Sequence, residues 1–220
     1  MSVTCRFNGR LGNIVFNICQ VIAYCKKHDL TYWFPKYAWA CINGIPTISV
    51  PDTGEQPLNP VQYHEPVIDG QPFYHEIPKM DNIEFNGYYQ SFRYFEDYRQ
   101  DILDAFNLPH ITDYGIVGLG VRRGDCVNQP DAFPMAPMGY YHRAIEYMQD
   151  KGYNKFRIYT DDIPWCQAEF TEQNYPGTTF EYYEGDDFLQ KYISFTQVEH
   201  HICARSTFDL TAAWINRNPN

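Results

Sequence analysis

A chain of 220 residues is long enough to bury a substantial core, as one large domain or as two small ones. Its formal net charge of −10 argues against non-specific binding to nucleic acid or to an anionic membrane, so a basic site must be local. No apolar run approaches the roughly 20 residues that span a bilayer, and the N-terminus lacks a secretion signal. We therefore expect a cytoplasmic protein, with at most peripheral contact at the inner membrane face.

The seven cysteines include no C-x-x-C pair. An odd set of this kind is typical of reduced thiols rather than of a disulfide framework or a zinc site. We assign the cysteines no chemistry and expect no metal site.

The N-terminal segment predicts a strand, a glycine turn and a helix. Residues 3–7 alternate as a short strand, Gly9 and Gly12 lie in the turn that follows, and apolar residues recur at helical spacing over residues 11–25. This order is typical of the start of a Rossmann-type unit. The glycines would let the backbone approach an anion at the helix start, and Asn13 would add a donor. A plain tight turn is the alternative.

The rest of the N-terminal half is less regular. Residues 30–34 and 83–89 have strand patterns, and residues 95–106 have a helical pattern. Between the two strands, residues 43–80 carry seven of the fifteen prolines, and we expect them to be mostly irregular. We place the boundary between the two halves near residue 110.

A second Rossmann-type strand leads to two cations. The apolar residues 116–121 predict a buried strand, which delivers Arg122, Arg123, Gly124 and Asp125 at its carboxyl end. Ligands of open α/β folds bind at such ends, and adjacent guanidiniums need anionic partners. One interpretation is a diphosphate site in which Asp125 orients a guanidinium. The alternative is a strand end whose arginines point to opposite faces, one solvated and one paired internally.

Three further helices and two further strands are predicted in the C-terminal half. The helices cover residues 138–150, residues 186–196 and a stretch that follows Thr207 and runs to about residue 216, and the strands cover residues 156–160 and 178–182. Two residues that follow the first of these strands, Asp161 and Asp162, precede another helix start, so one of them is expected to cap it. The other is free to accept hydrogen bonds from a purine or a ribose.

Two polar residues and a histidine pair complete this half. Ser206 and Thr207 stand just before the last helix, where they could hold phosphate or simply cap the helix. His200 and His201 have no metal-ligand spacing to a partner, and we interpret them as strand-end residues.

Five stretches in the same order are similar to motifs of the α-1,2-fucosyltransferases, a family that uses GDP-fucose. They are residues 9–13, 87–95, 121–125, 159–166 and 200–214, which resemble the family's G-x-L-G-N, G-Y-x-Q-S-x-x-Y-F, H-V-R-R-G-D, S-D-D-x-x-W-C and H-x-I-x-x-S-T-F motifs. The resemblance spans nearly the whole chain. Five ordered motifs are far more specific than any single one.

The resemblance implies an α/β fold of the GT-B type, with two Rossmann-type halves whose parallel sheets are flanked by helices. Residues 1–110 would form the acceptor side and residues 111–220 the nucleotide-sugar side. The implied activity is an inverting, metal-independent transfer of L-fucose from GDP-fucose to a sugar hydroxyl. The expected acceptor position is O-2 of a terminal galactose in an oligosaccharide or a glycolipid. No cofactor is implied.

The resemblance also assigns roles to residues. Arg122 and Arg123 would hold the diphosphate and stabilise the leaving GDP, Asp125 would orient an arginine, and Asn13 would reach the reacting centre. The implied donor-binding set is Gly12, Arg122, Arg123, Asp161, Asp162, Ser206, Thr207 and Phe208, with Asp161 on the guanine. Candidates for a general base are Asp125, His142 and Glu146.

Several positions depart from the family pattern. Gly120 stands where the family usually has His, Cys126 where it has Tyr, and residues 210–211 where it has a Trp pair. The sequence ends at Asn220, soon after the last motif, so the C-terminal half is expected to be shortened. Two alternatives therefore remain: a catalytically inactive module that binds a glycan or GDP, and a transferase that uses a different GDP-sugar.

Overall fold

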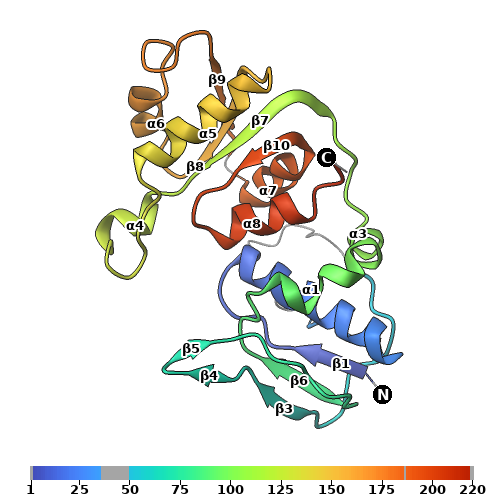
Figure 1. The fold of residues 1–220 in the computed structure, drawn as a ribbon. Helices are drawn as coiled ribbons and strands as arrows, with labels where there is room; N and C mark the ends of the chain where they lie inside the picture. The colour runs from blue at the N-terminus through green and yellow to red at the C-terminus, as the bar shows by residue number, and fades with distance from the viewer. Residues whose placement is uncertain (1, 36–49, 186, 219–220) are drawn as a thin grey trace. The chain divides into compact units, whose positions relative to one another are not determined.

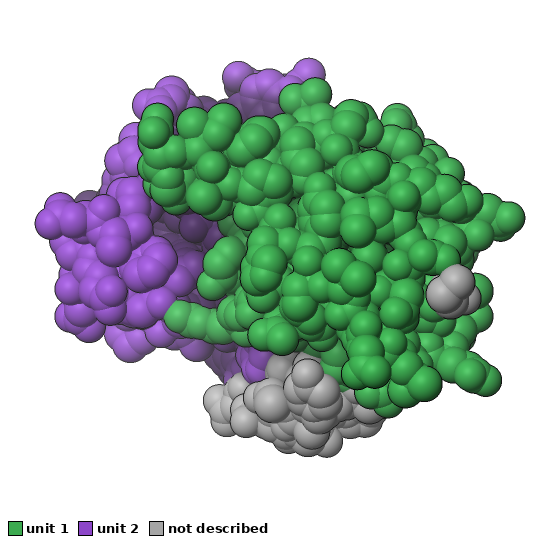
Figure 2. Space-filling model, turned by 90° about the horizontal axis from the view of Figure 1, so that it is seen from below, with its two compact units in different colours: residues 1–108 green, residues 109–220 purple. Residues whose placement is uncertain are grey.

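The computed structural model describes residues 2–35, 50–185 and 187–218. The chain forms two α/β units, Met1–Leu108 and Pro109–Asn220 (Figures 1 and 2). The boundary between them lies close to the predicted residue 110.

Unit 1 contains a four-stranded parallel sheet with the order β2-β1-β6-β3. The strands are β1 (Ser2–Cys5), β2 (Thr31–Tyr32), β3 (Val61–His64) and β6 (Ile83–Asn86), and a separate hairpin joins β4 (Val67–Ile68) to β5 (Gln71–Pro72). The helical elements are α1 (Leu11–His28), the 3₁₀ turns η1 (Phe92–Tyr94) and η2 (Glu96–Tyr98), and α3 (Arg99–Phe106).

Helix α1 is the main core element of unit 1. It is buried along nearly its whole length, and its cations, Lys26 and Lys27, lie in the last turn, where the helix dipole favours them. The helix ends at Asp29, whose left-handed backbone lets its N–H bond to the carbonyl of Cys25. The predicted strand, turn and helix at the N-terminus are therefore confirmed.

Two predicted elements of unit 1 differ in the structure. The helix expected over residues 95–106 is divided into η2 and α3, and Phe95, which precedes η2, packs its ring against that of Phe16 with the centroids 5.8 Å apart. Strand β3 lies in the segment expected to be irregular. It is an edge strand with mostly exposed side chains, so it carries no hydrophobic alternation in the sequence. Residues 43–49 of that segment lie outside the described residues.

Unit 2 contains a second four-stranded parallel sheet, with the order β10-β7-β8-β9. The strands are β7 (Asp113–Val121), β8 (Lys155–Thr160), β9 (Thr179–Tyr182) and β10 (Val198–Ile202). The helices are α4 (Gly124–Asn128), α5 (Met138–Asp150), α6 (Ile163–Glu169), α7 (Phe188–Gln197) and α8 (Thr207–Trp214). The short helix α4 and strand β10 were not given as predicted elements, although His200 and His201 of β10 were interpreted as strand-end residues. Two parallel sheets flanked by helices confirm the predicted fold class.

The two faces of β7 are built differently. Successive side chains of a strand point to opposite faces. Val117, Leu119 and Val121 pack in one core cluster with residues of α5 and α6. On the other face, Gly118 and Gly120 lie against Phe195 of α7 and Asp209 of α8. Helices α5 and α6 therefore cover one face of the sheet and α7 and α8 the other (Figure 1).

In each sheet, the direction in which successive strands are added reverses beside the first strand of the unit. In unit 2 the chain runs outward through β7, β8 and β9 and then returns to place β10 on the other side of β7. In unit 1 the corresponding change of direction lies between β1 and β6. The crevice outside the carboxyl ends of the strands at such a switch point is where open α/β sheets bind ligands.

Among the helices of the described residues, none combines the length and the apolar character needed to cross a bilayer.

The close packing of α7 on β7 predicts that Gly118→Ala destabilises unit 2. A Cβ atom at Gly118 would lie 2.7 Å from Cδ2 of Phe195, so the sheet and α7 would have to separate. We expect a loss of about 1–3 kcal/mol in the free energy of unfolding, measured by chemical denaturation. Gly139→Ala on α5 is the control, because its Cβ would meet only the flexible end of Arg143, and its effect should stay within about 1 kcal/mol.

Candidate functional site

Two cations lie at the carboxyl end of β7, and each has its own carboxylate. Nη2 of Arg122 lies 3.0 Å from both carboxylate oxygens of Asp125, in the first turn of α4. Nε of Arg123 lies 2.9 Å from Oδ2 of Asp162, at the start of α6. The two side chains are 27% and 19% exposed, so both are shielded without being removed from solvent. This differs from the alternative of one solvated and one paired arginine.

Arg123 is held at three points. Besides its ion pair with Asp162, its guanidinium carbon lies 3.8 Å from the centroid of the Trp165 ring, and its backbone N–H donates to Oδ1 of Asp161 at 2.8 Å. The ion pair engages Nε, and a guanidinium has five N–H donors, so the two Nη groups are available to an anion. Trp165 belongs to one of the sequence motifs, but the sequence alone does not predict its contact with Arg123.

The two aspartates after β8 have separate tasks. Asp162 is the N-cap of α6, since its carboxylate accepts from the backbone N–H of Trp165 at 3.2 Å. The hydrogen bond from Arg123 lowers the pKa of Asp162, so this carboxylate stays ionised. Asp161 is exposed and closes the turn after β7, where a Cβ atom on Gly124 would lie 2.5 Å from its Oδ2. The sequence predicted that either Asp161 or Asp162 caps this helix, and the structure shows that the cap is Asp162.

The start of α8 lies at the same edge of the sheet as the arginines. Strand β10 pairs with β7, with Ile202 opposite Leu119, so the loop after β10 emerges beside the end of β7. Ser206 occupies the N-cap position without making a side-chain capping bond, and Thr207 begins the helix. The Phe208 ring packs 4.9 Å from the ring of Tyr192, in the α7–α8 contact. The structure thus brings Ser206, Thr207 and Phe208 to the switch point of unit 2.

A buried carboxylate at this edge was missed by sequence reasoning. Asp209, in the first turn of α8, is only 6% exposed, and its Oδ2 accepts from the backbone N–H of Ala204 at 2.7 Å. Burial raises its pKa to about 7, against the opposing influence of that N–H and of Arg122. A Cβ atom at Gly120 would lie 2.6 Å from its Cγ. The sequence shows that Gly120 departs from the family pattern. Only the fold shows that the carboxylate of Asp209 occupies the space where a side chain at position 120 would lie.

The predicted residues of unit 1 lie at its own switch point. Gly9 has a φ of +79° in the turn after β1, and Gly12 is buried in the first turn of α1. Asn13 accepts a hydrogen bond from Nε2 of Gln90, which follows β6, at 2.9 Å. A Cβ atom at Gly9 would also lie 3.0 Å from Cγ of Asn13. Glycine is therefore required there both by the positive φ and by the lack of space for a side chain. The contact between Asn13 and Gln90 joins two of the motifs.

The general-base candidates differ in their surroundings. Asp125 is engaged by Arg122. His142 and Glu146 are exposed on α5, where the His142 ring stacks on Tyr175 with centroids 4.9 Å apart. Within residues 2–35, 50–185 and 187–218, no group of three or more His, Cys, Asp or Glu side chains could hold a metal ion.

The fold and the site define the class: a protein of two Rossmann-type α/β units with a carboxylate-braced arginine pair at the switch point of the second. Residues 71–219 match the model of glycosyl transferase family 11, and the chain belongs to this family. The resemblance to the α-1,2-fucosyltransferases is thereby confirmed.

Two curated relatives are both from Escherichia coli. The O-antigen biosynthesis glycosyltransferase WbnK is 30% identical over 131 residues, which cover 53% of this chain and 42% of the relative. The alpha-1,2-colitosyltransferase is 25% identical over 149 residues, which cover 61% of this chain and 51% of the relative. The chain thus spans about half the length of the curated relatives it matches.

Among solved structures, the chain is similar to POFUT1 in complex with GDP. The TM-score is 0.52 at 12% sequence identity, over 99% of this chain and 94% of that one. This likeness shows the fold and supports the assignment of the two units to the GT-B type.

The packing of Gly120 against Asp209 predicts that the two positions are coupled. Gly120→Ala would force a methyl group into the buried carboxylate, and we expect a loss of about 1–3 kcal/mol in the free energy of unfolding. The same change in an Asp209→Ala background should cost much less, because the carboxylate is gone. A double-mutant cycle by chemical denaturation measures the coupling, and additive effects would contradict this account of the contact.

The raised pKa of Asp209 predicts a pH dependence of stability. The folded protein keeps the Asp209 proton until pH about 7, whereas the unfolded chain releases it near pH 4, so unfolding is favoured as the pH rises between these values. Asp209→Asn removes this effect. We expect the free energy of unfolding of the variant, relative to the parent, to increase from pH about 4 to about 7 and then to level off.

Denaturation curves at several pH values test this prediction. His201, whose pKa burial lowers to about 4, acts in the opposite direction, but it is common to both proteins and cancels in the difference. Asp150→Asn, at the exposed end of α5, is the control and should run parallel to the parent. A constant difference between Asp209→Asn and the parent would show that Asp209 is ionised in the folded protein.

Proposed function

We propose that this protein is an inverting, metal-independent glycosyltransferase that transfers L-fucose from GDP-fucose to a sugar hydroxyl. The observation that carries the proposal is the arginine pair at the carboxyl end of β7, in which each guanidinium is fixed by its own carboxylate. Guanidiniums with free N–H donors match the oxygens of a diphosphate in geometry and in charge.

The chemistry of the reaction explains why fixed cations are useful. When the bond between the anomeric carbon and the diphosphate breaks, negative charge grows on a phosphate oxygen of the leaving GDP. Arg122 and Arg123, already held by Asp125 and Asp162, stabilise that charge without reorganising at the moment of reaction. In this proposal Arg122 and Arg123 perform the electrostatic task that a divalent cation performs in other transferases.

The carboxylates of the site act through the arginines. Asp125 and Asp162 are positioning residues, because they hold guanidiniums and face the donor only through them. Asp161, Ser206, Thr207 and Phe208 complete the donor site in this proposal: Asp161 contacts the guanine, and the start of α8 receives the phosphate, which the helix dipole favours there. Gly12 and Asn13 lie at the switch point of unit 1, and in this proposal Gly12 helps to bind the donor and Asn13 reaches the reacting centre.

The two units take different substrates in this proposal. Unit 2 holds the nucleotide sugar, and unit 1, residues 1–110 in the division made from the sequence, contributes to the acceptor side with Asn13 at the reacting centre. The acceptor is an oligosaccharide or a glycolipid, and the expected linkage is to O-2 of a terminal galactose. The relatives support a glycan acceptor through the names that they carry, O-antigen biosynthesis and alpha-1,2 transfer.

The donor sugar is the least constrained part of the proposal, because the arginines bind the diphosphate and not the sugar. The colitosyltransferase relative makes a colitose donor one alternative. A panel of GDP-fucose, GDP-colitose and GDP-mannose decides among donors, with release of the free sugar as the readout. An inactive module that binds GDP is the remaining alternative, and it would bind GDP without consuming any donor.

Loss of either arginine is expected to weaken GDP binding. Each charge-assisted pair of hydrogen bonds contributes about 1.5–3 kcal/mol, so Arg122→Ala and Arg123→Ala should each raise the Kd for GDP by roughly 10- to 100-fold in isothermal titration. GDP-fucose hydrolysis by the parent, measured in parallel, reports turnover of the donor.

Arg143→Ala is the matched control, since Arg143 is exposed on α5 and contacts neither carboxylate of the site. It should bind GDP as the parent does. Thermal melting of all four proteins separates a lost contact from a lost fold. A folded parent that binds no GDP would end the transferase assignment.

A further inference from the structure

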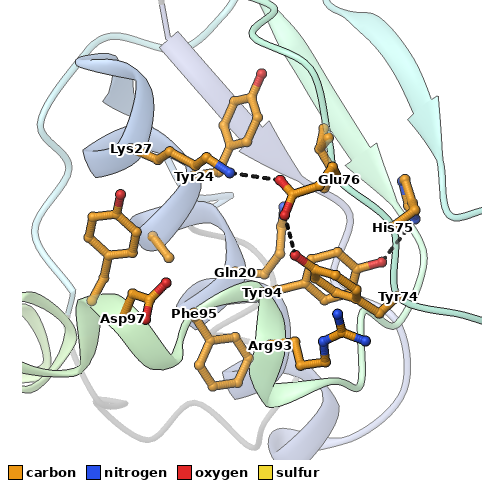
Figure 3. A pocket seen from close by; sticks show the side chains of 13 residues that line it. Gln20, Tyr24, Lys27, Tyr74, His75, Glu76, Arg93, Tyr94, Phe95 and Asp97 are labelled. Atoms are coloured by element: carbon orange, nitrogen blue, oxygen red, sulfur yellow. Dashed lines mark hydrogen bonds and ion pairs between the residues drawn. The ribbon is translucent and has the colours of Figure 1, made fainter.

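A small cavity lies in unit 1 away from both switch points. Its volume is about 100 Å³, it opens to solvent, and it is lined by residues of α1, of η1 and η2, and of the segment that follows β5 (Figure 3). From α1 it is lined by Gln20, Ala23, Tyr24 and Lys27, which recur at a spacing of three and four residues and so share one face of the helix. None of these residues belongs to a motif that the proposed function uses.

A buried amide without a partner faces this cavity. Gln20 is only 1% exposed, and neither its Nε2 nor its Oε1 has a hydrogen-bond partner among the described residues. Figure 3 shows its side chain leaving α1 toward the space that Tyr74, Glu76 and Arg93 enclose. A buried polar group that stays unpaired costs about 1–3 kcal/mol, so an amide here needs a compensating role.

The charges at the rim of the cavity are balanced. Lys27 pairs with Glu76, with Nζ 2.8 Å from Oε2, and Tyr74 donates to Oε1 of the same carboxylate at 2.6 Å. Arg93 lies over the Tyr74 ring, with its guanidinium carbon 3.9 Å from the centroid, and Asp97 lines the opposite side. Two cations and two anions leave no net charge for an ionic ligand. The cavity therefore favours a neutral, hydrogen-bonding one.

The lining combines aromatic rings with polar groups of fixed geometry. Tyr94 and Phe95 add apolar surface beside the amide of Gln20, which presents two donors and an acceptor side by side. Such an amide pairs with a group that offers an acceptor and a donor together, namely vicinal hydroxyls or an acetamido group. At roughly 30 Å³ of liquid volume per water, the cavity has room for about three waters or for one edge of a sugar ring.

We propose that this cavity is a binding site for one neutral saccharide unit, whose polar edge pairs with the amide of Gln20. The inference rests on the proposed function and extends it: the cavity holds a sugar of the acceptor glycan other than the one that reacts. Binding at a distance from the reacting centre contributes to the selection of the acceptor.

The test uses the whole chain and two probes, N-acetylglucosamine and glucose, which differ only at C2. Each is titrated by ligand-observed NMR against the parent, Gln20→Leu and Gln100→Leu. Gln20→Leu keeps the volume but removes the amide, and we expect at least a tenfold loss of affinity for the probe that binds the parent. Gln100, which donates to Asp104 on the exposed face of α3, is the matched control and should leave binding unchanged.

A second variant guards against a fold defect in the first. Ala23→Leu fills the cavity from the same face of α1 while keeping Gln20, and it should also abolish binding. If the cavity holds water only, neither sugar will bind the folded parent, and the inference is overturned. Binding that Gln20→Leu leaves unchanged would overturn it as well.

The GDP titration keeps this inference separate from the proposed function. GDP binding should be the same in Gln20→Leu as in the parent, because the arginine pair lies in unit 2. Intact GDP binding without saccharide binding removes only the cavity assignment, whereas loss of GDP binding by the parent removes the transferase assignment itself. If the parent binds only N-acetylglucosamine, Gln20 reads an acetamido group; if it binds both, Gln20 reads hydroxyls.

Discussion

Two guanidiniums on consecutive residues repel each other, and the structure of unit 2 is arranged around that repulsion. Arg122 and Arg123 leave the same strand end, yet each finds a carboxylate on a different element, Asp125 in α4 and Asp162 at the start of α6. The pairs connect β7 to the two helices that follow β7 and β8. In a chain of net charge −10, two adjacent cations are thereby fixed at one edge of one sheet.

The glycines of β7 bring the remaining elements to that edge. With no side chains at Gly118 and Gly120, α7 and α8 approach the sheet closely, and the first turn of α8 comes to lie beside Arg122. A strand of alternating apolar and glycine residues therefore does two things. It fills the core on its α5 side, and on the other side it lets the start of α8 lie close to the edge that carries the arginines.

Much of this could be predicted from the sequence, because the central strands and helices carry strong local patterns. The apolar run before Arg122 and the helical spacing in α1 depend on neighbours close in the sequence. The pairing of Arg123 with Asp162 joins residues 39 positions apart and follows no local rule. Strand β3 escaped detection because its side chains are mostly exposed at a sheet edge.

The residues that the sequence did not reveal are polar residues that become buried only when helices and strands pack together. Asp209 in a first helical turn looks like an ordinary dipole-stabilising carboxylate, and Gln20 in a helix looks like a surface residue. Only the packing of α8 on β7, and of the segment after β5 on α1, reveals that both are enclosed. Local patterns predict elements, but they do not show which polar side chains those elements enclose.

The contact between Gly120 and Asp209 also constrains the order in which this sequence can change. Family members usually carry His at the position of Gly120, and no side chain fits there while the carboxylate of residue 209 occupies the space. A side chain can therefore enter position 120 without disturbing the packing only if the carboxylate at position 209 is removed first or at the same time. The reverse does not hold, because loss of the carboxylate leaves Gly120 undisturbed, so the identity of residue 209 decides which residues position 120 can accept.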